Sequence, residues 1–204
     1  MSPVITVNRP ATALEPVAPG RGRSGQGRKT TMTAWRGGVS TRQWETRLRS
    51  ALARCPGSID LMGVGNPIRG DDAVGLTIAS ELRETLGANP VRGYRIHKTT
   101  LAPERLLSKL ALSSGRMLIF DAVEASKEPG AIVCARLGES KYGYFATHNI
   151  PLMLIPGMES RLDDVFLVGV QPLSVEVGEG LSDVVRESAA QIVAAVTDEV
   201  GAKL

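Results

Sequence analysis

The 204-residue chain has a length that suits one domain and can bury a substantial core. Its hydrophobic content of 43% and charged content of 22% are ordinary for a globular protein, and its aromatic content of 4% argues against binding nucleic-acid bases by stacking. The formal net charge is +3, but residues 1–54 hold ten Lys/Arg against two Asp/Glu, whereas the remainder holds fourteen against nineteen. The acidic remainder argues against a nucleic-acid-binding core.

Residues 1–40 are rich in Pro, Gly, Arg, Ser and Thr, a composition that buries too little apolar surface to fold, so we expect a disordered basic leader. We favour a dispensable tail, with Met32 as an alternative start, over a nucleic-acid- or lipid-binding arm or a transit peptide. Two cysteines, Cys55 and Cys134, make neither a disulfide framework nor a zinc motif. With no apolar run of about 20 residues and no secretory signal, we expect a cytoplasmic protein that binds neither membrane nor nucleic acid.

The remaining residues, 41–204, alternate between helical and extended patterns and are predicted to form one domain. The helices carry apolar residues every three or four positions, and the strands are short apolar runs bounded by glycine or polar residues. Ser182 is expected to cap the last helix. In chain order, the predicted elements are a helix over 41–55, a strand over 58–65, a helix over 73–87, a strand over 93–100, a helix over 102–112, strands over 116–125 and 130–137, a helix that begins near 147, a strand over 163–172 and a helix over 182–200.

This alternation predicts an α/β fold with a mostly parallel sheet. The run over 116–125 is almost entirely apolar until Asp121, the pattern of a strand buried on both faces. One strand is expected to run antiparallel, because the strand over 130–137 follows its predecessor with no helix between them.

The segment that leaves the first strand, GVGNPIRGDDAVG, has the outline of a phosphate-binding loop but not its charge. Its glycines have the spacing G-x-G-x(4)-G and no Lys-Ser/Thr follows, so neither the dinucleotide fingerprint nor the P-loop pattern matches. Two carboxylates, Asp71 and Asp72, precede the helix and would repel a pyrophosphate there. We therefore reject a nucleotide site.

Polar side chains gather where the carboxyl ends of parallel strands meet, the edge at which open α/β sheets bind ligands. Asp72 follows the first strand, Asp121 ends the third, and His148 lies in the loop after the fourth. Glu124 and Gln171 fall at the same edge. Two carboxylates and an imidazole suit a divalent transition metal, and zinc, nickel and manganese are all admissible.

Each of these residues also has an ordinary structural explanation. Asp72 suits the first turn of a helix, where a carboxylate contributes about 0.3–1 kcal/mol. Asp121 could accept hydrogen bonds from loop amides, and a lone histidine such as His148 is more often structural than a ligand. We favour the metal site because all three residues fall at one end of the sheet. Cys134 is expected in the core, and His97 is expected to be structural.

Four separated motifs, GVGNPIRGDDAVG, IFDAVEA, ATHNIPL and VGVQP…EVGEGLS, occur in this order over residues 59–200. Together they resemble the hydrogenase maturation endopeptidases, which process the large subunit of [NiFe] hydrogenases. The resemblance implies a three-layer α/β/α sandwich with a five-stranded sheet. It also implies that Asp72, Asp121 and His148 bind nickel, or another divalent metal in its place.

The resemblance further implies an endopeptidase that removes the C-terminal extension of a hydrogenase large-subunit precursor after nickel insertion, with the nickel borne by the substrate. We also expect the protein to be a monomer. Either the metal polarises the scissile carbonyl and a bound water, or it serves for recognition and Asp72 or Asp121 activates the water, as in an aspartic-type endopeptidase. The alternatives are a fold-related protease that acts on another protein, and a non-catalytic nickel-binding scaffold for hydrogenase assembly.

Overall fold

The predicted leader over 1–40 and the candidate ligand His148 both lie outside the residues that the structure describes. The computed structural model describes residues 43–53, 57–87, 93–100, 106–109, 115–139, 146–147, 150–151, 157–178 and 180–202.

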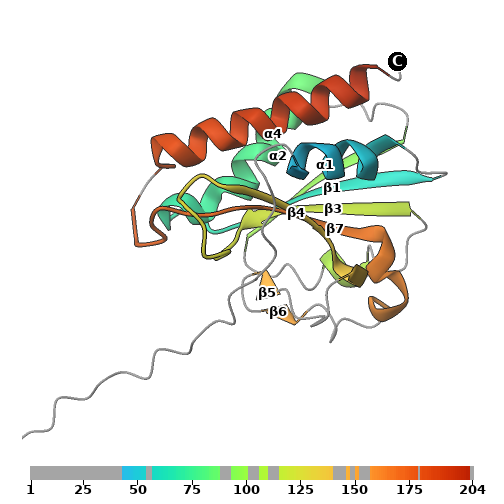
Figure 1. Cartoon of the computed structure of the whole chain (residues 1–204), viewed down its shortest axis with the longest axis horizontal. Coiled ribbons are helices and arrows are strands. Elements are labelled where there is room, and N and C mark those ends of the chain that lie inside the picture. Colours follow the sequence, from blue (N-terminus) through green and yellow to red (C-terminus); the bar gives the residue numbers. More distant parts are fainter. Residues whose placement is uncertain are drawn as a thin grey trace, which may run out of the picture. The chain divides into compact units, whose positions relative to one another are not determined.

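The main sheet has five strands, Ser58–Val64 (β1), Tyr94–Thr99 (β2), Gly115–Ala122 (β3), Ile132–Arg136 (β4) and Val165–Val170 (β7). They lie in the order β2-β1-β3-β7-β4. Figure 1 labels four of them, β1, β3, β7 and β4. The first three and β7 run parallel, and β4 pairs antiparallel with β7. The prediction of a mostly parallel five-stranded sheet with one antiparallel strand is confirmed.

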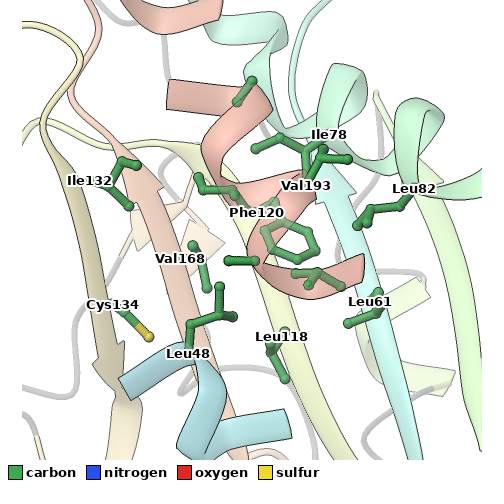
Figure 2. Close-up of a cluster of buried hydrophobic side chains, with 14 of the residues drawn as sticks. Leu48, Leu61, Ile78, Leu82, Leu118, Phe120, Ile132, Cys134, Val168 and Val193 are labelled. Atoms are coloured by element: carbon green, nitrogen blue, oxygen red, sulfur yellow. The ribbon is translucent and has the colours of Figure 1, made fainter. Parts of the chain in front are cut away.

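Three helices pack on one face of this sheet (Figure 1). Figure 2 shows Phe120 of β3 at the centre of the core beneath them, beside Ile78, Leu82 and Val193 of two of the helices. Full burial of a side chain of this size contributes about 1.5–3 kcal/mol to folding. None of the described helices is long and apolar enough to cross a membrane. The three helices span Gln43–Ala53 (α1), Val74–Leu86 (α2) and Asp183–Gly201 (α4).

The opposite face of the sheet carries a second apolar cluster. In the described part of the chain this face is covered by short segments, the helical residues 106–109 and the 3-10 helices Leu137–Glu139 (η2) and Glu159–Asp164 (η4). The predicted third layer is therefore present as short helical pieces, whereas the other face bears the long helices. The cluster comprises Met62, Val64, Leu107, Met117, Ile119, Leu137, Met158, Val165 and Leu167.

The helix predicted to begin near residue 147 is wrong for the residues described there. Ala146–Thr147 (β5) and Ile150–Pro151 (β6) instead form two short antiparallel strands. Pro151 explains the difference, because proline disfavours helical backbone in the residue before it and provides no N–H for a helix.

Asp60 of β1 is fully buried and forms an ionic cluster with two residues of β2. Its oxygens accept hydrogen bonds from Arg95 Nε at 2.8 Å and Nη2 at 2.7 Å, and His97 Nε2 lies 2.8 Å from Oδ1. Burial alone would raise the pKa of Asp60, but the hydrogen bonds and charges of His97 and Arg95 outweigh it and hold this pKa below its ordinary value. His97 is thus structural, as predicted.

Replacing Asp60 with Asn should lower the free energy of unfolding by about 1–3 kcal/mol, because a neutral amide replaces the buried charge that accepts these hydrogen bonds. A carboxyl group whose pKa is lowered in the folded state stabilises the protein above its ordinary pKa and loses that contribution as the pH falls. The difference between wild type and Asp60→Asn should therefore shrink below pH 3.8. Urea unfolding of both proteins at about pH 7 and about pH 3 measures the difference in their free energies of unfolding. The same difference at both pH values would contradict the prediction.

Candidate active site

Glycines bring the start of α2 into backbone contact with the carboxyl ends of β1 and β3. A Cβ on Gly63 would lie 2.1 Å from the carbonyl oxygen of Gly75, and a Cβ on Gly75 would lie 2.1 Å from that of Phe120. A Cβ on Gly65 would lie 2.3 Å from the carbonyl oxygen of Asp72. These glycines therefore serve the close packing of a helix on two strands, a role that requires no bound phosphate.

Asp72 is held by its backbone at this edge of the sheet. It lies in the 3-10 helix Gly70–Ala73 (η1), which packs against β3 and leads directly into α2. Its carbonyl oxygen accepts a hydrogen bond from Asn66 N at 3.1 Å, and its N–H donates to Arg69 O at 3.0 Å. The residue is only partly buried, and these contacts hold its backbone beside the end of β1.

Asp121 lies one residue before the end of β3 and is fully buried. Its Oδ1 accepts a hydrogen bond from the N–H of Ala122 at 2.8 Å. Because β1 and β3 are parallel neighbours, the structure places Asp72 and Asp121 at the same end of the sheet, as predicted. No three His, Cys, Asp or Glu side chains among the described residues form a metal-sized cluster, and His148 lies outside them, so the trio of ligands stays a prediction.

Asp71, the first acid of the pair, has a structural role that the sequence did not reveal. Its carboxylate is buried and accepts hydrogen bonds from the N–H groups of Leu173 (2.8 Å), Ser174 (3.2 Å) and Ser182 (2.7 Å). These donors follow Asp71 by more than 100 residues, so no local pattern could have identified them. Because Ser182 immediately precedes α4, Asp71 also places negative charge at the N-terminus of that helix.

Ser182 occupies the N-cap position of α4, but the predicted side-chain cap is absent. Its hydroxyl donates instead to Asp71 Oδ2 at 3.0 Å. A hydrogen bond to a charged acceptor is stronger than one to a neutral backbone group, which explains why the hydroxyl is directed away from the helix.

The loop between β1 and α2 is also joined by backbone hydrogen bonds to the segment after β7. Gly70 N donates to Gly178 O at 2.9 Å, and Gly178 N donates to Ile68 O at 3.1 Å. Asp71 N donates to Ser174 O at 3.1 Å. Gly70 has a φ of +49°, a conformation that favours glycine, so the turn that aligns these groups depends on this residue.

Gln171, at the end of β7, fixes the loop that follows Asp121. Its buried side chain accepts hydrogen bonds from the N–H groups of Ala125 (2.8 Å) and Lys127 (3.3 Å) and donates to Glu124 Oε2 at 3.1 Å. Both polar residues predicted near the ligands therefore lie at the expected edge. Their hydrogen bonds support the loop after Asp121.

Cys134 lies in the core beside Leu48 and Val168, as predicted (Figure 2). It is completely buried, and burial raises the pKa of its thiol to about 12. The thiol is therefore protonated at neutral pH. Because the thiolate is the nucleophilic form, Cys134 is not suited to covalent catalysis.

Comparison with known proteins points to one family. Residues 100–199 match the family model of HycI, hydrogenase maturation protease. A protein of Methanocaldococcus jannaschii assigned as a hydrogenase maturation protease is 27% identical over 124 residues, which cover 57% of this chain and 73% of the relative.

Solved structures agree with these sequence matches. The [NiFe] hydrogenase maturation protease HycI from Thermococcus kodakarensis KOD1 is 25% identical and superimposes with a TM-score of 0.64 over 76% of this chain and 98% of its own. The hydrogenase 3 maturation protease is also 25% identical, with a TM-score of 0.56 over 68% of this chain and 88% of its own. The arrangement of strands and helices described above is thus that of these proteases.

Gly75→Ala should lower the free energy of unfolding by about 1–3 kcal/mol, because its methyl group would collide with backbone at the ends of β1 and β3. This loss should exceed the gain of about 1 kcal/mol that alanine normally brings to a helix. Gly201→Ala is the matched control, because Gly201 also lies in a helix but has no atom within 4 Å of the position that a Cβ would take. Chemical denaturation of both variants measures the effect, and equal stabilities would disprove the packing role of Gly75.

Proposed function

Because the chain belongs to the hydrogenase maturation protease family, we propose that it is an endopeptidase that removes the C-terminal extension of a [NiFe] hydrogenase large-subunit precursor after nickel insertion. The substrate is a folded precursor that carries nickel, and the enzyme acts on it as a monomer. The proposed setting is the cytoplasm, where a free thiol such as that of Cys134 is the ordinary state.

The observation that carries this proposal is the position of two carboxylates at the carboxyl end of the sheet. Backbone contacts of Gly65 and Asn66 fix Asp72 at the end of β1, and Asp121 lies near the end of the neighbouring β3. Asp71 is excluded from this role, because both oxygens of its carboxylate already accept hydrogen bonds from Leu173, Ser174 and Ser182. The proposal therefore assigns the chemistry to the second acid of the pair.

We assign nickel recognition to Asp72, Asp121 and His148. Two carboxylates and one imidazole are a donor set that suits a divalent transition metal, and three ligands leave coordination positions for groups of the substrate. Nickel that the precursor already holds would complete the contact between the two proteins. Metal insertion would then be the condition for cleavage.

The carboxylates also supply a base for hydrolysis. A water oxygen attacks the scissile carbonyl carbon while Asp72 or Asp121 accepts the proton of that water. The C–N bond then breaks, and the proton passes to the leaving amine. Nickel bound at this site would polarise the carbonyl or the water and so lower the barrier further.

Asp72→Asn and His148→Ala should each leave the precursor uncleaved while the protein stays folded. The first change removes a base and a metal ligand, and the second removes the imidazole ligand. Incubation with nickel-loaded precursor followed by mass analysis of the product measures cleavage, and circular dichroism confirms folding. Asp183→Asn is the control, because Asp183 is a fully exposed acid at the start of α4 and should not affect cleavage. Normal processing by either site variant would refute the assignment of the site.

Nickel-loaded precursor should be cleaved by the wild-type protein, whereas nickel-free precursor should not. The reason is that nickel in the substrate supplies the contact with Asp72, Asp121 and His148. The mass of the large subunit after incubation reads out both reactions. Equal cleavage of the two precursors would contradict nickel recognition, and nickel-dependent binding without cleavage would favour an assembly scaffold.

A further inference from the structure

The carboxylate of Asp71 is saturated by donors from a single distant segment. Oδ1 accepts the N–H of Ser182, and Oδ2 accepts the N–H groups of Leu173 and Ser174 together with the Ser182 hydroxyl. The residue is 1% exposed, so water does not replace these partners. Hydrogen bonds to an ionised carboxylate are the stronger kind, and four of them fix its position firmly.

This anchor lies one peptide unit from Asp72. The peptide unit is planar, so a displacement of Asp71 is passed directly to the Cα atom of its neighbour. On its other side, Asp72 is held by Asn66 and Arg69 through backbone hydrogen bonds of 3.1 Å and 3.0 Å. The backbone that carries the Asp72 side chain is therefore clamped between the end of β1 and the segment after β7.

We propose that Asp71 is a positioning residue, which sets the place of the Asp72 carboxylate by holding η1 against Leu173, Ser174 and Ser182. This inference rests on the proposed function, in which Asp72 takes part in cleavage. A displacement of about 1 Å in a reacting group can reduce a rate about 100-fold, so a clamp this close to Asp72 has a measurable effect.

Asp71→Asn tests the clamp with almost no change in size. An amide has only one oxygen, so its NH2 group would face N–H groups that now donate hydrogen bonds to the carboxylate. Those hydrogen bonds would be lost, because a donor cannot accept from another donor. The first-order rate of precursor cleavage, measured at saturating enzyme so that binding does not limit it, should fall about 10–100-fold. In an Asp72→Glu background, where the carboxylate is already displaced, the same change should reduce the rate by about threefold or less, because the two effects are not independent.

Asp60→Asn is the matched control for loss of stability. Asp60 is also a buried, hydrogen-bonded aspartate of the same chain, but it lies four residues before the end of β1, about 13 Å along the strand. Its variant should be destabilised yet cleave at the wild-type rate below its unfolding temperature. A wild-type rate for Asp71→Asn, or an equal loss in the wild-type and Asp72→Glu backgrounds, would overturn the positioning role.

Ser182→Ala provides a second test if Asp71→Asn does not fold. It removes one of the four hydrogen bonds and should reduce the cleavage rate about two- to fivefold, whereas a wild-type rate would overturn the proposal. Asp72→Asn separates this inference from the function itself. Cleavage by Asp72→Asn would refute the proposed site, whereas loss of cleavage in Asp72→Asn with full activity in Asp71→Asn would refute only the positioning role.

Discussion

The buried carboxylate of Asp71 is the interaction on which the candidate site depends. Its hydrogen bonds join the loop after β1 to a segment that follows it by more than 100 residues. A buried carboxylate without donors is strongly unfavourable, and the N–H groups of Leu173, Ser174 and Ser182 supply the donors that Asp71 needs. The two motifs near opposite ends of the folded part therefore form one structural unit, and Asp72 lies at its boundary with the sheet.

This arrangement explains how the outline of a phosphate-binding loop occurs without a phosphate. In such loops, backbone N–H groups at a helix N-terminus point toward an anionic ligand. Here the N–H groups of Leu173, Ser174 and Ser182 point toward an anion that belongs to the chain itself. The glycines, in turn, allow α2 to touch β1 and β3 and leave no room for a ligand between them. The strand, glycine loop and helix thus carry a partly exposed acid, Asp72, in place of a bound phosphate.

The parts of the fold that depend on local patterns could be predicted from the sequence. The apolar run that ends at Asp121 identified β3 and placed this acid at the edge of the sheet. The helix expected near residue 147 was wrong, because Pro151 provides no N–H for a helix and disfavours helical backbone in the residue before it. The role of Asp71 and the direction of the Ser182 hydroxyl depend on contacts between distant segments, which no periodicity encodes. The sequence alone therefore identified the acidic pair but not the division of roles within it.

The ionic cluster around Asp60 has a consequence for the behaviour of the protein in concentrated solution. Strand β2 stands at one end of the sheet, so it offers an edge to which a strand of another molecule could add. Such exposed edges promote aggregation unless charged groups are placed along them. Arg95 lies on β2, is partly exposed and is paired with the buried Asp60, so a strand added there would have to remove water from a charged group. Arg95 therefore has two consequences: it stabilises the fold through Asp60, and it places a charge on an edge strand, where charge disfavours edge-to-edge association.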